Sequence, residues 1–97
     1  MHAPLTVQHE PSASRFCVKL VDGHEAVLQY RLQGQAIDLY HTEVPPAFRG
    51  RGVAEQLCRA AFEHAKTNGL QVFPSCPYIS GTYLKRHPEY APLAQRP

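Results

Sequence analysis

Hydrophobic and polar residues alternate along three runs in the first half of the chain, at 16–20, 26–32 and 37–41. A period of two is typical of a β-strand that buries one face. Asp22-Gly23 lies between the first two runs and Gly34 between the second and third, and both are turn signals. The pattern therefore predicts three antiparallel strands joined by short turns.

The period changes after the third run. From Ala54 to Ala65, apolar residues recur every three or four positions, which is the spacing of a helix with one buried face, and Asn68-Gly69 supplies a stop. Residues 70–73 form a short apolar run that suits a buried fourth strand. A strand-helix-strand order implies parallel pairing with a right-handed crossover, so the start of the helix should lie near the carboxyl end of the third strand. Ligands usually bind at that end of such a sheet.

The two ends of the chain differ in their signals. Residues 1–14 contain two prolines and little periodicity, so we expect a flexible lead-in to a single domain over 15–97. Residues 78–86 can form a short helix that ends at His87, because a residue before proline is disfavoured in helical geometry. The expected fold is a compact α/β (α+β) domain with antiparallel N-terminal strands, a β-α-β crossover and a short C-terminal helix.

Composition limits the classes of function. The chain has 97 residues, of which 43% are hydrophobic and 19% charged, as in an ordinary globular domain. The formal charge is only +2, and the basic residues are scattered, so we expect no direct nucleic-acid binding. No apolar stretch approaches the roughly 20 residues that span a bilayer, so we expect a soluble cytoplasmic protein without membrane association. The histidines and cysteines lack metal-site spacing, which predicts no metal and free thiols.

A basic, glycine-punctuated turn, Arg49-Gly50-Arg51-Gly52, stands directly before the predicted helix. The first turn of a helix has unpaired N–H groups and a partial positive charge, so it attracts anions such as phosphate. Glycine lets a ligand approach the backbone, and arginine can donate to phosphate oxygens. The turn is therefore a candidate phosphate site; a solvated basic bend is the alternative.

The same turn is part of a longer pattern. Residues 49–54 read R-x-x-G-x-A, which resembles the pyrophosphate-binding signature of the GNAT superfamily of acetyl-CoA-dependent N-acetyltransferases. The segments HTEVPPAFRGRGVAEQL and VFPSCPYISGTYLKRHPEY resemble the small, single-domain branch of that superfamily. That branch combines H-T-x-V-P, R-G-x-G-x-A and P-x-C-P-[YF] with a terminal H-P-E-Y. The resemblance covers residues 41–90 and implies a GNAT-like mixed sheet.

The resemblance also implies a cofactor site. Loop amides would hold the pyrophosphate of coenzyme A, and the pantetheine arm would run beside the third strand, where it parts from the fourth. The residues implicated in binding acetyl-CoA or coenzyme A are Thr42, Glu43, Val44, Arg49, Gly50, Arg51, Gly52, Val53, Ala54 and Cys76. Many superfamily members carry an Asn and, seven residues later, a Tyr near the cofactor sulfur. That spacing falls on Cys76 and Tyr83, with cysteine at the Asn position as in the small branch.

Acetyl transfer to an amine requires a neutral amine, a stabilised oxyanion and a protonated leaving thiolate. Glu43 or His41 could remove the amine proton, a backbone N–H near Val44 could polarise the carbonyl, and Tyr83 could protonate the sulfur. Each also has a purely structural explanation: a satisfied sheet histidine, a solvated carboxylate, and a tyrosine ring packed on the helix.

Cys76 offers a second route. A helix start nearby would favour its thiolate, so it could take the acetyl group first and pass it to the amine. A small apolar residue lining a pocket is the alternative, and direct transfer is the first choice. Cys17 lies in a predicted hairpin strand and Cys58 on the apolar face of the predicted helix, and both are expected to be structural.

The sequence thus predicts an acetyl-CoA-dependent N-acetyltransferase that modifies a primary amine, with a protein or peptide lysine as the expected acceptor class. Larger superfamily members have an N-terminal strand and helices that shape the acceptor side, whereas the first clear strand here begins near Phe16. An open acceptor site is therefore expected. An acyl-CoA-binding module with little or no activity is the alternative. A small interaction domain with a fortuitous loop is a third reading.

Overall fold

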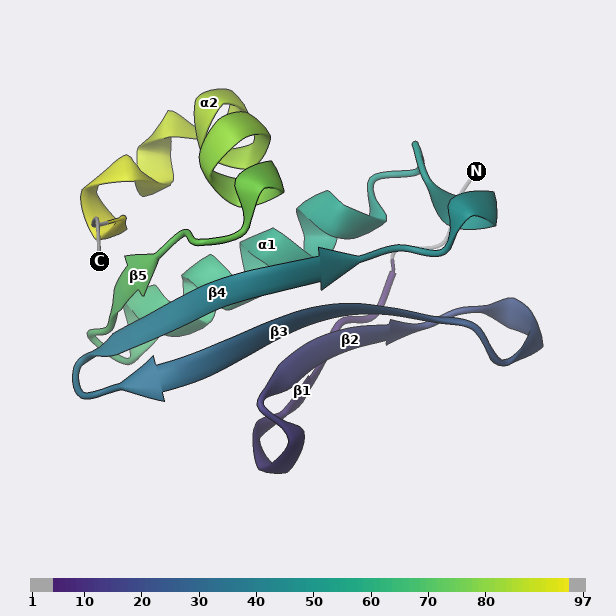
Figure 1. Ribbon diagram of the computed structural model, residues 1–97, viewed down its shortest axis with the longest axis horizontal. Helices are drawn as coiled ribbons and strands as arrows, with labels where there is room; N and C mark the ends of the chain where they lie inside the picture. The colour runs from purple at the N-terminus through teal and green to yellow at the C-terminus, as the bar shows by residue number, and fades with distance from the viewer. Residues whose placement is uncertain (1–4, 95–97) are drawn as a thin grey trace.

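Five strands form one mixed sheet in which spatial order follows sequence order (Figure 1). The computed structural model describes residues 5–94. Its strands are β1 (Gln8–Glu10), β2 (Arg15–Lys19), β3 (Glu25–Gln33), β4 (Ala36–Glu43) and β5 (Gln71–Phe73). β1 to β4 pair antiparallel, and β5 pairs parallel to β4. The three predicted antiparallel strands and the parallel strand after the helix are confirmed.

β1 corrects the expectation of an unstructured lead-in. His9 pairs with Phe16 of β2, and the two rings stack with centroids 4.2 Å apart. His9 Nε2 also lies 2.7 Å from the Tyr30 hydroxyl oxygen, so a hydrogen bond joins β1 to β3. The lead-in prediction is therefore wrong for residues 8–10, while residues 1–4 lie outside the described part of the chain.

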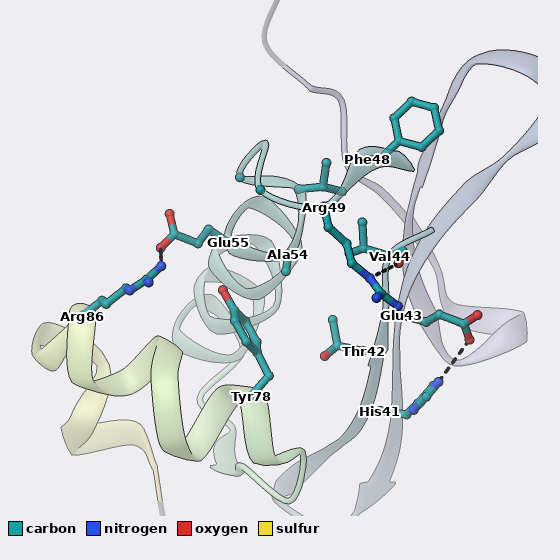
Figure 2. Close-up of a pocket in the computed structure, with 13 residues that line it drawn as sticks. His41, Thr42, Glu43, Val44, Phe48, Arg49, Ala54, Glu55, Tyr78 and Arg86 are labelled. Atoms are coloured by element: carbon teal, nitrogen blue, oxygen red, sulfur yellow. Dashed lines mark hydrogen bonds and ion pairs between the residues drawn. The ribbon is translucent and has the colours of Figure 1, made fainter. Parts of the chain in front are cut away.

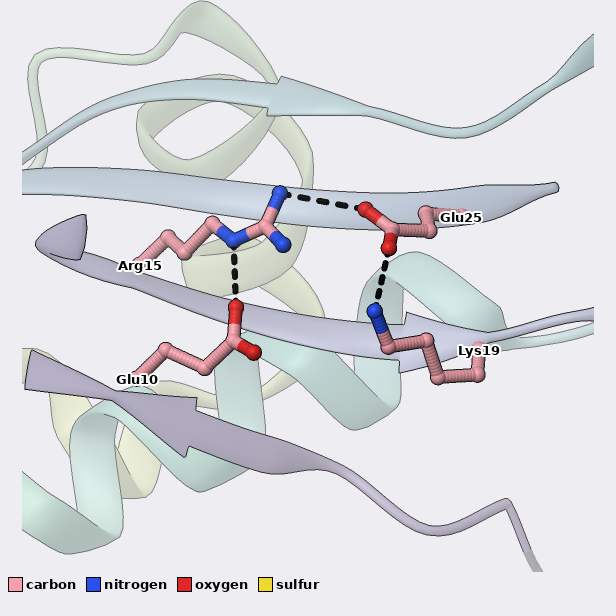
Figure 3. Close-up of polar contacts among 4 residues, drawn as sticks. All are labelled: Glu10, Arg15, Lys19 and Glu25. Carbon is pink, nitrogen blue, oxygen red and sulfur yellow. Dashed lines mark hydrogen bonds and ion pairs between the residues drawn. The ribbon is translucent and has the colours of Figure 1, made fainter. Parts of the chain in front are cut away.

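The sheet face opposite the helices carries an ion-pair network that links β1, β2 and β3 (Figure 3). Arg15 Nε lies 2.5 Å from Glu10 Oε1, and Arg15 Nη1 lies 3.1 Å from Glu25 Oε2. Lys19 pairs with the other oxygen of Glu25. The Arg15 guanidinium holds the pKa of Glu10 below its usual value. Cross-strand charge pairs of this kind favour one register over its alternatives.

Helix α1 (Val53–Thr67) packs its apolar face on the other side of the sheet. Six of its residues are buried at the predicted spacing: Val53, Leu57, Cys58, Ala61, Phe62 and Ala65. Leu28, Ile37 and Leu39 lie in the same core and are fully buried. Burying a side chain of this size contributes about 1.5–3 kcal/mol to stability. The predicted long helix is confirmed.

A second helical segment follows β5. It consists of a π-helical turn, η4 (Ile79–Tyr83), continued by α2 (Leu84–Arg86). His87 leaves helical geometry with φ −128° and ψ 67°, as its place before proline predicts. The helix expected over 78–86 is confirmed, although its π-helical turn is not encoded by any simple pattern. The 3₁₀ turn η5 (Pro88–Leu93) follows, and Ala94 then bridges to Val72 at the outer edge of β5.

β4 and β5 separate soon after they pair. Asp38 and Phe73 are the last residues in register, and the backbone N–H of Cys76 then donates to the Leu39 carbonyl at 2.9 Å. β4 runs on to Glu43 alone on this side. A bulge in β4 opposite residues 29 and 30 shifts the register with β3 at the same level. The end of β4, which still pairs with β3 but is unpaired on the side of β5, forms one wall of the cleft described next.

Candidate functional site

A cleft of about 880 Å³ lies where the end of β4, the loop after it, the start of α1 and the C-terminal helical segment meet (Figure 2). The lining residues are His41, Thr42, Glu43, Val44, Phe48, Arg49, Gly50, Gly52, Val53, Ala54, Glu55, Tyr78 and Arg86. All the residues predicted to bind the cofactor line this cleft except Arg51 and Cys76. The structure thus brings together residues from three separate segments.

The loop before α1 owes its shape to two glycines. Gly50 and Gly52 have φ values of +78° and +76°, a region that residues with a side chain rarely adopt. Open space surrounds both positions, since a Cβ added at either would meet no atom within 4 Å. Gly52 is the N-cap of α1, and no side chain caps the helix. The first amides of α1 therefore have no side-chain partner and suit an anion in the cleft.

The two loop arginines have different positions. Arg49 Nε donates to the Val44 carbonyl at 3.1 Å, which holds the side chain across the cleft wall (Figure 2). The Arg51 guanidinium instead lies over the Phe48 ring, 5.5 Å from its centroid. Arg51 is therefore not brought into the cleft, although its backbone belongs to the loop.

An ion pair closes one side of the cleft. Arg86 Nη1 lies 3.2 Å from Glu55 Oε1, and His87 Nε2 lies 3.6 Å from the same oxygen. Glu55 stands in the first turn of α1, where the helix dipole favours a carboxylate. The sequence does not predict Glu55 or Arg86 as site residues, because the pair is far apart in sequence and each resembles an ordinary surface charge.

Cys76 lies behind the cleft wall. Its side chain is 5% exposed, and its thiol donates to the Thr42 hydroxyl oxygen at 3.4 Å. Thr42 itself lines the cleft from β4 (Figure 2). One hydroxyl group thus separates the cysteine from the cleft.

Tyr83 does not reach the cleft. Its side chain is fully buried between Phe62, at a ring distance of 5.6 Å, and His87, at 4.5 Å. Within residues 5–94 its hydroxyl finds no hydrogen-bond partner, and burial raises the pKa of Tyr83 far above its usual value. Tyr83 is thus buried in the core, as Cys76 is, and neither residue lines the cleft.

Tyr78 is the tyrosine that the structure does bring to the cleft. It comes from the start of the C-terminal helical segment, lines the cleft and is half-buried (Figure 2). A tyrosine hydroxyl is protonated at neutral pH, and burial raises the pKa of Tyr78 further. Tyr78 is the last position of the P-x-C-P-[YF] pattern, and this pattern is the sequence feature that could have identified it as a site residue.

His41 and Glu43 form a pair at the mouth of the cleft. Their side chains project from β4 on the other side from Thr42, and His41 Nε2 lies 3.4 Å from Glu43 Oε2 (Figure 2). Both side chains are exposed, at 48% and 68%. Two proton-accepting groups therefore lie together where solvent and an incoming amine can reach them.

Comparisons with known proteins agree with this geometry. A family model described as GCN5-related N-acetyl-transferase matches residues 15–93. The chain belongs to the GCN5-related N-acetyltransferase family. This confirms the family to which the loop and cysteine motifs point, and the mixed sheet with helices confirms the expected α+β fold.

The sequence similarity to named relatives extends over most of the chain. Protein NATD1 from Gallus gallus and from Mus musculus are each 41% identical over 87 residues, covering 88% of this chain and 78% of the relative. Protein NATD1 from Danio rerio is 38% identical over 90 residues, covering 89% of this chain and 81% of the relative. The solution structure of a GCN5-like protein from Staphylococcus aureus matches with a TM-score of 0.68. The match covers 96% of this chain and 90% of the Staphylococcus aureus chain. Because the sequence identity is only 22%, this match supports the fold alone.

Two other kinds of site are absent from residues 5–94. Between residues 5 and 94, no three His, Cys, Asp or Glu side chains gather closely enough to hold a metal ion. Within the same range, no helix is both long and apolar enough to cross a bilayer.

Proposed function

We propose that the protein binds acetyl-CoA in this cleft and transfers the acetyl group to a primary amine, with a lysine side chain of a protein or peptide as the acceptor class. The observation that carries the proposal is the start of α1. A glycine N-cap leaves the first amides without a side-chain partner, and those amides adjoin a cleft bounded by the unpaired end of β4. An anion fits the first feature, and an extended pantetheine arm fits the second.

The cofactor contacts follow from this arrangement. The pyrophosphate lies against the amides from Gly50 to Ala54, and Arg49 adds a charged donor. The pantetheine amides hydrogen-bond to the free edge of β4 at Thr42–Val44, as an added strand would. The Arg86 side chain is close enough to the cleft to offset phosphate charge once it turns from Glu55.

The transfer itself is a direct attack. The amine nitrogen attacks the thioester carbonyl, the C–N bond forms, and the C–S bond breaks. Glu43 or His41 accepts the proton that the nitrogen loses, and the Tyr78 hydroxyl replaces Tyr83 as the proposed donor to the leaving thiolate. A backbone N–H near Val44 stabilises the oxyanion.

Cys76 serves as part of the wall in this proposal. Its 5% exposure and its hydrogen bond to Thr42 favour direct transfer over a cysteine-bound acetyl group. All three cysteines are free, which suits a reducing cytoplasmic compartment.

One observation favours a second function, an acyl-CoA-binding module with little activity. The tyrosine at the expected acid position is buried away from the cleft. Two measurements separate the functions: calorimetric titration with acetyl-CoA, and thiol release in the presence of lysine peptides. Binding with peptide-dependent release supports the transferase, binding without release supports the module, and absence of binding contradicts both.

A further inference from the structure

Asp38 stands at the point where β4 and β5 part. It is the last β4 residue in register with β5, opposite Phe73, and it faces Arg31 on β3. Its neighbours Ile37 and Leu39 are fully buried in the core. Because side chains alternate along a strand, Asp38 projects from the other face, away from α1.

The bulge in β4 puts Asp38 on the same face as His41. Asp38 pairs with Arg31 and His41 pairs with Gln29, and these two partners are two residues apart on β3. Asp38 and His41 are therefore separated by a two-residue step, about 7 Å along the sheet, despite being three residues apart in sequence. Without the bulge they would lie on opposite faces.

The Asp38 carboxylate is not satisfied by its neighbours. Its Oδ1 is buried and has no hydrogen-bond partner within residues 5–94. Arg31, directly across the strands, forms no ion pair with it there; the guanidinium lies over the Tyr40 ring, 4.3 Å from the centroid. A buried carboxylate oxygen without a partner is costly, so a cation bound to this carboxylate would gain a charged hydrogen bond.

We propose that Asp38 binds a second positive charge on the acceptor, so that the preferred substrate is an extended peptide with lysine or arginine two residues from the lysine that is acetylated. This rests on the proposed acetyltransferase function. In an extended peptide, side chains two residues apart lie on one face about 7 Å apart, which matches the separation of Asp38 and His41. The half-buried aromatic residue Phe73 lies directly opposite Asp38 in the sheet and suits a cationic side chain.

The test compares two peptides and three substitutions. One peptide is Lys-Ala-Lys with blocked ends, and in its match the second lysine is norleucine, which keeps the chain length and removes the charge. The substitutions are Asp38→Asn, Arg31→Gln and the control Asp22→Asn, which removes the same charge from an exposed turn. KM and kcat are measured for each peptide at saturating acetyl-CoA, and acetyl-CoA affinity is measured separately by calorimetry.

The native protein should show a KM about tenfold lower for the dilysine peptide, the effect of one charged hydrogen bond. Asp38→Asn should remove this difference while kcat and acetyl-CoA affinity stay unchanged. Arg31→Gln should enlarge the difference, since a competing cation is removed, and the control should preserve it. Equal KM values in the native protein, or a preference that survives in Asp38→Asn, would overturn the proposal.

Failure of the proposed function gives a different result. If acetyl-CoA binds but neither peptide is acetylated, the two peptides are titrated into protein saturated with coenzyme A. Tighter binding of the dilysine peptide that Asp38→Asn abolishes would keep Asp38 as a cation site on an inactive module. Equal binding of the two peptides would remove that site as well.

Discussion

The Cys76 thiol donates to the Thr42 hydroxyl at 3.4 Å, and this contact joins the segment after β5 to the unpaired end of β4. Thr42 faces the cleft, whereas Cys76 is almost fully buried. The contact therefore fixes the wall beside which the thioester is proposed to lie.

Cys76→Ser should retain most of the turnover, because a hydroxyl can make the same hydrogen bond and the direct route does not use the sulfur as a nucleophile. The measurement is the transfer rate with a lysine peptide, together with intact mass after mixing with acetyl-CoA. Loss of turnover in the variant, together with a transient acetyl adduct on Cys76 of the native protein, would favour the two-step route instead.

Gly52→Val should weaken acetyl-CoA binding at least tenfold. A β-branched residue at φ +76° strains the loop by about 1–2 kcal/mol and puts a side chain where the pyrophosphate is expected. Gly69→Val is the matched control, since Gly69 has φ +65° beyond the far end of α1. Both variants should lose thermal stability. If they also bind acetyl-CoA equally well, the loop is not the pyrophosphate site.

Glu55→Gln should strengthen acetyl-CoA binding by about threefold to tenfold, because it removes a negative charge from the cleft and frees Arg86. Arg86→Gln should weaken binding by a similar factor. Both effects should shrink as salt is added, since charges near the surface are screened. Calorimetry at low and high ionic strength measures both effects. Weaker binding in Glu55→Gln, or stronger binding in Arg86→Gln, would contradict the assignment.

His9 should make stability depend on pH. Burial, with a smaller effect from His64, holds the pKa of His9 below its usual value. The folded protein therefore favours neutral His9: this contribution is complete above the ordinary histidine pKa of about 6.5 and is lost as pH falls below it. Urea unfolding at pH 7.5 and pH 5 should show a smaller loss of stability in His9→Gln than in the native protein. An equal loss would mean that other groups dominate.

Local patterns predict most of this fold. Alternation identifies β2, β3 and β4, and the helical period identifies α1, because each buries one continuous apolar face. β1 gives no such signal: it has three residues, and its packing depends on the stacking of His9 on Phe16, a tertiary contact. A strand as short as β1 forms because its neighbouring strand pairs and packs with it, so its own residues do not predict it.

The sequence predicts the part of the site that depends on backbone conformation, which is the glycine loop before α1. Gly50 and Gly52 both have a positive φ, which favours glycine over other residues, and their spacing before the helix marks the loop in the sequence. Tyr78 and Tyr83 could not be sorted by spacing, since the choice depends on which face of the C-terminal helical segment packs on α1. Asp38 and His41 share one face of the sheet because of a bulge between them, and no residue pattern predicts that bulge.

The central claim is that acetyl-CoA binds at the start of α1 and along the end of β4. The most direct test is titration of ¹⁵N-labelled protein with acetyl-CoA, monitored by amide chemical shifts. The largest changes should fall on Gly50, Gly52 and Val53, and on Thr42 to Val44. Absence of change there, or changes centred on the opposite end of α1 around His64, would contradict the account.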